Sequence, residues 1–211
     1  DLRESQRYMK LSVDAIMAIA FAIALGIVSV SRLFAPIFWG EDFAPCAYIL
    51  SALALSIPFS GFANVIRMQY LIPNGMDGAY ILSVILGAVS NLTANSLLIP
   101  RCGALGAAVG TVIAEGVVCA AQCLAVKKRI DILAYLKSTA FFGMAGLLMY
   151  GAVRVLDQRA EITVSWLLLE IVVGGSVYCI LYVLYLYHTK NELLMTALQK
   201  LGGAHQNNDR G

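Results

Sequence analysis

Charged residues are scarce in this sequence of 211 residues. Asp, Glu, Lys and Arg together make up 13% of it, whereas soluble domains carry roughly 25%. The net charge is only +2, so the composition does not point to a nucleic-acid partner. A low charge content of this kind disfavours an ordinary soluble domain.

The motifs of common enzyme and metal sites are also missing. The sequence has no GxSxG, HExxH or P-loop motif, which removes the usual nucleophile elbow, zinc-protease and nucleotide-binding sites. Its five cysteines show no CxxC spacing. Cys119 and Cys123, four residues apart, could form a metal pair on one helix face, but free cysteine commonly packs as a small apolar residue. We favour that interpretation, and we predict a protein that is not an enzyme and uses no metal or cofactor.

Long apolar runs are what the sequence has in abundance. Hydrophobic residues make up 60% of it, and the mean hydropathy is +0.77. A helix needs about 20 mostly apolar residues to cross the hydrocarbon of a bilayer, and turn-forming sequences such as WGEDF, IPNGMDG and IPRCG separate the runs. The pattern predicts an all-α membrane protein, with residues 13–187 forming a bundle of about six transmembrane helices at 13–34, 44–66, 79–99, 105–126, 139–155 and 163–187.

The two ends of the chain are polar by comparison. Residues 1–12 lack the layout of a signal peptide, and we interpret them as a cytoplasmic lead-in. Because the chain begins at Asp1 and not at a methionine, we expect it to be a piece of a longer protein. After the last apolar run, leucines at helical spacing predict an interfacial amphipathic helix at residues 188–201. Residues 202–211 are predicted to be a disordered tail.

Positive charges fall mainly on one side of the predicted membrane. With six helices, the N-terminus, the second and fourth loops and the C-terminus share a side. That side holds eleven of the fifteen Lys and Arg residues, namely Arg3, Arg7, Lys10, Arg67, Lys127, Lys128, Arg129, Lys137, Lys190, Lys200 and Arg210. The other side holds Arg32, Arg101, Arg154 and Arg159. Cytoplasmic loops carry the Lys/Arg excess, so both termini of this segment are predicted to be cytoplasmic.

Four polar residues within the predicted helices are candidates for a substrate or ion cavity. Glu115 lies near the middle of the fourth helix, where a carboxylate is expensive and usually faces the bundle interior or water. Glu115 could bind a proton, a cation or a polar headgroup. Alternatively, it could be a neutral carboxyl group that serves only in helix packing. Asn91 and Asn95 share one face of the third helix. Arg67 could line a cytoplasmic entry for an anionic substrate, because a guanidinium fork matches phosphate geometry. Interhelical hydrogen bonds for the asparagines and a membrane anchor for Arg67 are the simpler alternatives.

Other residues in the helices are interpreted structurally. Asp14 and Glu170 lie nearer to helix ends, so we expect them to be solvated or to reach the interface. Pro58 is expected to kink the second helix. Small residues at a spacing of four let helix backbones approach closely, which predicts a helix-packing role for Gly103, Gly106 and Gly110.

A longer stretch of the sequence resembles a known family. The run FWGEDFAPCAYILSALALSIPFSGFANVIRMQYLIPNG, followed by NSLLIPRCGALGAAVGTVIAE, resembles the C-terminal half of bacterial polysaccharide flippases. These flippases belong to the multidrug/oligosaccharidyl-lipid/polysaccharide exporter superfamily. The pattern is an Asn, a Leu–Ile–Pro turn, a Gly, and a Gly–Ala–Ala run leading into a polar helix. It is carried here by Asn95, Leu98, Ile99, Pro100, Gly103, Gly106, Ala107, Ala108 and Thr111.

The resemblance implies one lobe of a two-lobed transporter in the bacterial cytoplasmic (inner) membrane. Such a protein moves undecaprenyl-linked oligosaccharides across the membrane for surface polysaccharide biosynthesis. Its partners would be membrane lipids, the lipid-linked oligosaccharide and a missing N-terminal lobe of the same chain. No individual substrate contact can be carried over. Three alternatives stay open: a drug/cation antiporter of the same superfamily with Glu115 as the coupling carboxylate, a membrane-embedded polysaccharide polymerase or glycosyltransferase, and a structural subunit.

Overall fold

The computed structural model describes residues 2–158 and 161–188, and this part of the chain is helical apart from short turns. The elements are α1 (Leu2–Trp39), a 3₁₀ turn at Glu41–Phe43, α2 (Cys46–Ala54), α3 (Ser56–Ile66), a π-helical turn at Arg67–Leu71, α4 (Asp77–Val126), α5 (Ile132–Asp157) and α6 (Val164–His188). No strand occurs among the described residues. The predicted all-α class is therefore confirmed.

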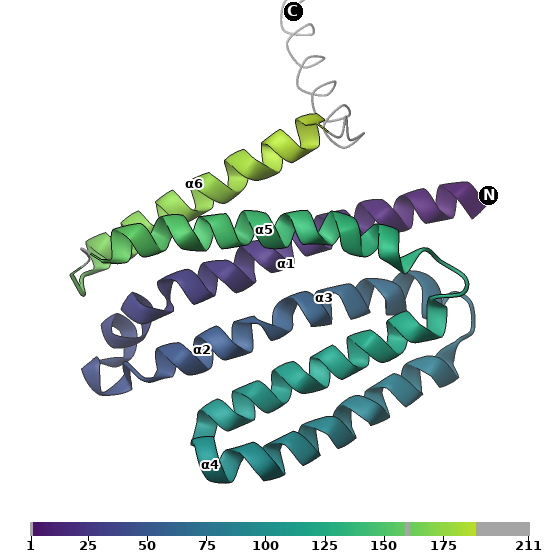
Figure 1. The fold of residues 1–211 in the computed structure, drawn as a ribbon, viewed down its shortest axis with the longest axis horizontal. Coiled ribbons are helices and arrows are strands. Elements are labelled where there is room, and N and C mark those ends of the chain that lie inside the picture. Colours follow the sequence, from purple (N-terminus) through teal and green to yellow (C-terminus); the bar gives the residue numbers. More distant parts are fainter. Residues whose placement is uncertain (1, 159–160, 189–211) are drawn as a thin grey trace, which may run out of the picture.

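Five stretches of helix within the described residues are long and apolar enough to cross a membrane. They are α1 from Arg7 onward, the segment Cys46–Leu71, α4, α5 and α6. Figure 1 shows these helices running side by side, with α6 at one edge of the bundle and α4 at the other. The arrangement is an all-α bundle of long apolar helices.

The long helix α4 reverses direction at Gly103. The backbone there has φ 55° and ψ −135°, a conformation open to glycine because it has no Cβ. Figure 1 shows the chain folding back on itself at this point, so α4 consists of two antiparallel arms. The two arms contain the third and fourth predicted segments, 79–99 and 105–126. Because α4 counts as one helical stretch but contains two of the predicted passes, five long stretches correspond to six predicted passes.

The second predicted segment, 44–66, is divided into α2 and α3. Helix α2 ends at Ala54, and Pro58 lies in the first turn of α3. A proline inside a helix lacks an N–H donor, and its ring clashes with the carbonyl four residues earlier, which here is the carbonyl of Ala54. The expected distortion at Pro58 is thus a break between two helices.

Helix α1 lies at the centre of the lobe and contacts α2, α3, α5 and α6. Its buried Val13 and Met17 belong to one apolar cluster with Ile66 and Phe142. Close packing of this kind holds membrane helices together by dispersion, since lipid offers no competing water to expel. Helix α4 instead packs against α2 and α3, which leaves it at the edge.

Helix ends differ from the predicted limits. Helix α1 begins at Leu2, within the predicted lead-in 1–12, and continues past residue 34 to Trp39; α5 begins at Ile132 and not at 139. Membrane helices extend beyond the apolar stretch that hydropathy detects, because their ends continue into the headgroup region. The predicted amphipathic helix 188–201 and tail 202–211 lie outside the described residues, apart from His188, the last residue of α6.

Candidate substrate cavity

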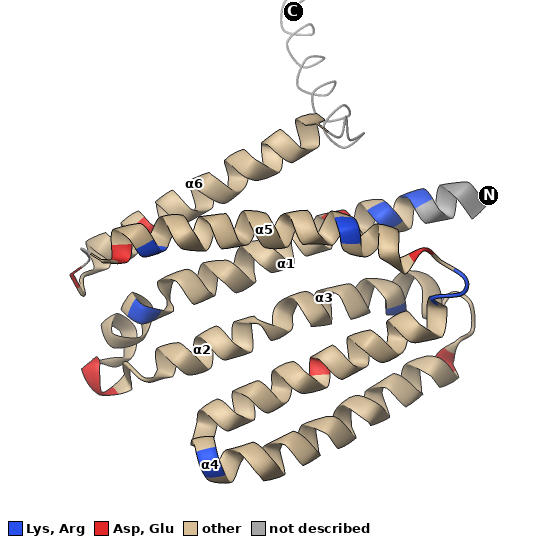
Figure 2. Cartoon of the chain, in the orientation of Figure 1, with Lys and Arg blue, Asp and Glu red and all other residues tan. Residues whose placement is uncertain are grey.

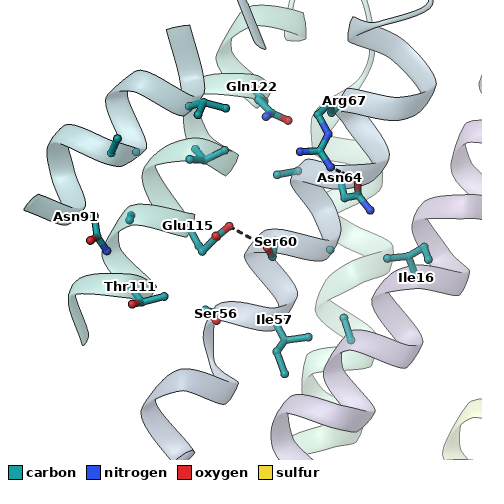
Figure 3. Close-up of a pocket in the computed structure, with 18 of the residues that line it drawn as sticks. Ile16, Ser56, Ile57, Ser60, Asn64, Arg67, Asn91, Thr111, Glu115 and Gln122 are labelled. Atoms are coloured by element: carbon teal, nitrogen blue, oxygen red, sulfur yellow. Dashed lines mark hydrogen bonds between the residues drawn. The ribbon is translucent and has the colours of Figure 1, made fainter. Parts of the chain in front are cut away.

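A cavity in the described part of the chain has a volume of about 940 Å³. It lies between α1, α3 and both arms of α4, and Figure 3 shows polar side chains from α3 and α4 pointing into it. All four candidates, Glu115, Arg67, Asn91 and Asn95, line this cavity. The structure therefore brings them together, although their role as substrate or ion contacts stays a prediction.

Glu115 lies on the second arm of α4 and faces α3 across the cavity. The hydroxyl of Ser60 donates a hydrogen bond to Glu115 Oε2 over 2.9 Å, shown as a dashed line in Figure 3. The side chain is neither fully buried nor fully exposed, so it borders the open space of the cavity. This places a carboxylate in the middle of an apolar bundle with only a hydroxyl as its hydrogen-bond partner among the described residues.

Asn91 and Asn95 form a small amide pair on the first arm of α4. Asn95 Nδ2 donates to Asn91 Oδ1 over 2.9 Å, as expected for residues four apart on one helix face. Asn95 Oδ1 is buried and has no hydrogen-bond partner among the described residues. The opposite arm presents Gly110, where an added Cβ would overlap the Asn95 side chain. Gly110 thus makes room for the amide that lines the cavity.

Arg67 lies at the end of α3, where the helix passes into a π-helical turn. Its Nη2 donates to Asn64 Oδ1, and its guanidinium carbon lies 5.3 Å from the centre of the Tyr80 ring. These contacts hold the guanidinium against the cavity wall while other N–H donors stay available, because arginine has five of them. Arg67 and Glu115 are the charged residues that line the cavity.

The three glycines of the predicted packing motif have different roles. At Gly106 an added Cβ would overlap the Leu98 carbonyl on the other arm of α4, so this glycine allows the arms to approach, as does Gly110. At Gly103 a Cβ would meet nothing within 4 Å. The packing interpretation is wrong for Gly103, whose positive φ makes the reversal instead.

Several cavity residues were not among the predicted candidates. Ser60 pairs with Glu115, Thr111 also lines the cavity, and Gln122 is 1% exposed. Gln122 Nε2 donates to Ser83 Oγ on the first arm over 3.1 Å. Placing a glutamine side chain within an apolar membrane helix costs free energy, as placing a carboxylate there does. The argument that singled out Glu115 in the sequence would therefore also have singled out Gln122.

A second polar cluster lies at the opposite end of the bundle from the N-terminus (Figure 2). Arg32 of α1 and Arg154 of α5 both bind Asp157, the last residue of α5. Glu170 of α6 faces this cluster. It is 1% exposed, and neither carboxyl oxygen has a hydrogen-bond partner among the described residues. The expectation that Glu170 and Asp14 are solvated is wrong: Asp14 is 5% exposed, because neighbouring helices cover both.

Metal ligands do not gather anywhere in residues 2–158 and 161–188: no group of three or more His, Cys, Asp or Glu side chains is close enough to hold an ion there. Cys119 and Cys123 are partly buried free cysteines and pack beside the apolar cluster of α1.

Comparison with known proteins gives one informative match. The sequence matches no family model and no curated protein. The described fold superimposes on a solved structure titled "Lipid II flippase MurJ, inward closed conformation" with a TM-score of 0.74. In fold, the chain is similar to a lipid flippase. The match covers 90% of this chain but 41% of the MurJ chain, at 18% sequence identity. At that identity the likeness concerns the fold, and the chain spans well under half the length of the flippase it matches.

Proposed function

We propose that this chain is one lobe of a transporter that flips lipid-linked oligosaccharides across the bacterial cytoplasmic membrane. The observation that carries the proposal is the cavity of about 940 Å³ with polar side chains in its wall, in a bundle whose fold is similar to that of a lipid flippase. Polar side chains inside a membrane bundle are costly and mark substrate or ion pathways. A flippase needs a path for a polar headgroup and no covalent step, so a transporter fits better than an enzyme.

The chemistry of the cavity wall suits a saccharide. Amide side chains offer both donors and acceptors, and hydroxyls do the same; sugar hydroxyls need both. The wall presents Asn64, Asn91, Asn95, Ser56, Ser60 and Thr111. Arg67 adds a guanidinium, which binds phosphate oxygens in a bidentate way. A saccharide joined to a lipid through phosphate presents both kinds of group.

A second lobe would complete the transport path. The cavity is not enclosed by this chain, and polar surface inside a membrane must be covered by protein or water. We expect the N-terminal lobe of the same chain to face it, with the two lobes rocking around the substrate. Figure 2 shows Lys and Arg, in blue, gathered near the N-terminal end of the bundle, on the start of α1 and in the loop between α4 and α5. That excess supports a cytoplasmic location for this end.

The test is a flipping assay with the full-length protein in proteoliposomes. A lipid-linked oligosaccharide carrying a fluorophore is reconstituted, and its appearance on the far leaflet is followed with a membrane-impermeant quencher. Arg67→Gln is compared with Arg129→Gln, since both arginines follow helices of the same lobe but only Arg67 lines the cavity. We expect Arg67→Gln to slow flipping about tenfold or more, the effect of losing a charged hydrogen bond of roughly 1.5–3 kcal/mol. Equal rates in both variants, or no flipping by the wild type, would contradict the proposal.

The drug/cation antiporter is the second candidate, because Glu115 has only a serine hydroxyl as its partner among the described residues. It predicts efflux of a small lipophilic cation that depends on an ion gradient and stops in Glu115→Gln. The guanidinium of Arg67 in the same cavity disfavours a cationic substrate. Gradient-dependent cation efflux without oligosaccharide flipping would favour the antiporter.

A further inference from the structure

The arginine cluster at the far end of the bundle is built around one buried carboxylate. Asp157 is 5% exposed, whereas the side chains of Arg32 and Arg154 are 55% and 50% exposed. Arg32 Nε donates to Asp157 Oδ1 over 2.8 Å, and Arg32 Nη2 donates to the Asp157 carbonyl over 3.0 Å. Arg154 Nη1 donates to Asp157 Oδ2 over 2.9 Å. Two guanidinium groups from different helices are thus fixed by a single anionic residue.

This arrangement leaves positive charge and hydrogen-bond donors unused. One carboxylate balances one guanidinium, so the three residues carry a net charge of +1. Arg154 Nε also donates to the Tyr150 hydroxyl over 2.8 Å, which orients the side chain without neutralising it. Arg32 Nη1 and Arg154 Nη2 make no hydrogen bond to the described residues. Both arginines line a recess of about 540 Å³, together with Asp157 and Gln158.

The recess lies next to surfaces that suit a membrane. Val155 and Leu168, on the adjacent turns of α5 and α6, are 69% and 57% exposed, as expected for side chains that face hydrocarbon. Phe38 and Trp39 at the end of α1 are 60% and 47% exposed, and amphipathic rings favour the headgroup level of a bilayer. These flanks favour a position for the two arginines near the level of the lipid phosphates.

We propose that Arg32 and Arg154 form a binding site for the phosphate of a lipid headgroup, outside the 940 Å³ cavity and independent of the proposed transport function. The two guanidiniums bind the two oxygens of the same carboxylate, so they lie close enough for one phosphate to bridge them. Charge-assisted hydrogen bonds from arginine to phosphate are among the strong ones in proteins. A phosphate bound there would accept hydrogen bonds from the guanidinium donors that Asp157 leaves unused. The shared chemistry is a phosphate anion, and a bilayer lipid is the source that the exposed apolar flanks favour.

Glu170 is the other carboxyl group that faces the cluster. Glu170 is buried and receives no hydrogen bond from either arginine. It therefore occupies none of their hydrogen-bond donors. The donors that Asp157 and Tyr150 do not use are left to an external anion.

The test measures phosphatidylglycerol binding to the purified full-length protein by native mass spectrometry, with diacylglycerol and inorganic phosphate as the other probes. Diacylglycerol has the same chains without phosphate, and inorganic phosphate is the anion without chains. We expect the double variant Arg32→Gln/Arg154→Gln to bind phosphatidylglycerol about tenfold or more weakly, as expected for losing hydrogen bonds to a charged group. The matched control is Arg101→Gln, which should leave the affinity unchanged. Arg101 is exposed and lies two residues before the α4 reversal at Gly103, and Figure 1 shows this reversal at the same end of the bundle as the end of α5.

A second variant separates ligand binding from helix packing. Asp157→Asn keeps the shape of the side chain but removes the competing negative charge, so it should bind phosphatidylglycerol more tightly than the wild type, even if it unfolds more easily. An ion pair that only joined α1 to α5 would show no such gain. Equal binding by wild type and double variant, or equal binding of diacylglycerol and phosphatidylglycerol, would overturn the proposal. Inorganic phosphate that binds as tightly as phosphatidylglycerol would assign the site to a free anion and overturn the lipid assignment.

Discussion

The close approach of the two α4 arms at Gly106 can be tested by one methyl group. An added Cβ at Gly106 would lie 2.6 Å from the carbonyl carbon of Leu98 and 3.0 Å from the amide nitrogen of Ile99. Ordinary contacts begin at 3.4 Å, so the nearer carbon is 0.8 Å too close. Both atoms belong to the backbone, which cannot rotate away as a side chain could. The variant Gly106→Ala must therefore push the arms apart.

The expected cost follows from two opposing contributions. Forcing an extra methyl group into a packed interior costs typically about 1–3 kcal/mol, whereas replacing glycine by alanine within a helix gains roughly 0.8–1.0 kcal/mol. Gly116→Ala is the matched control, because it lies on the same arm and its added Cβ would meet nothing within 4 Å. The control Gly116→Ala therefore receives only the gain in helix propensity. The free energy of unfolding should thus be about 1–3 kcal/mol lower in Gly106→Ala than in Gly116→Ala.

The assay is reversible unfolding of the full-length protein by SDS in mixed micelles, followed by circular dichroism. The two variants share a substitution type and a helix, so the difference between them removes the effect of helix propensity. If Gly106→Ala were as stable as Gly116→Ala, the backbone of the first arm of α4 would not lie against Gly106. That result would contradict the close approach of the two arms.

Two further variants test buried hydrogen bonds by the same unfolding assay. Tyr178→Phe removes a hydroxyl that donates over 2.7 Å to a buried carbonyl of α1, so it should lower the free energy of unfolding by about 0.5–1.5 kcal/mol. Tyr187→Phe, at a side chain 77% exposed, should have no measurable effect, and equal losses in both would contradict the contact. Ser83→Ala leaves the buried amide of Gln122 without its acceptor and should cost about 1–3 kcal/mol. Ser96→Ala, exposed on the same arm, is its control, and a Ser83→Ala variant as stable as this control would show that the amide finds another partner.

The candidate cavity was partly accessible from the sequence. Asn91 and Asn95 are four residues apart, so any helix places them on one face, and Glu115 stands out because a carboxylate is rare within an apolar run. These arguments need only the local chain. They do not say that Ser60 of α3 donates to Glu115, or that Gly110 faces Asn95, because each contact joins separate helices or arms.

The same limit explains the wrong expectations. Glu170 and Asp14 lie near the ends of apolar segments, and position along a helix favours a solvated side chain. Whether water reaches them depends on which neighbours cover that face, and α1, α5 and α6 pack against one another here. Likewise, Gly103 shares its spacing with packing glycines, but its positive φ is a property of the turn and not of the spacing.

The sequence by itself determined that this is an all-α membrane protein, because crossing a bilayer requires about 20 consecutive apolar residues and a backbone that satisfies its own hydrogen bonds. Both requirements act within each segment and can be read without neighbours. Only the tertiary structure decided where the polar groups meet: Arg32 and Asp157 are 125 residues apart in the chain yet 2.8 Å apart in space. Such contacts depend on how helices pack, and in lipid the packing is set by shape and hydrogen bonding between helices, which no single segment specifies.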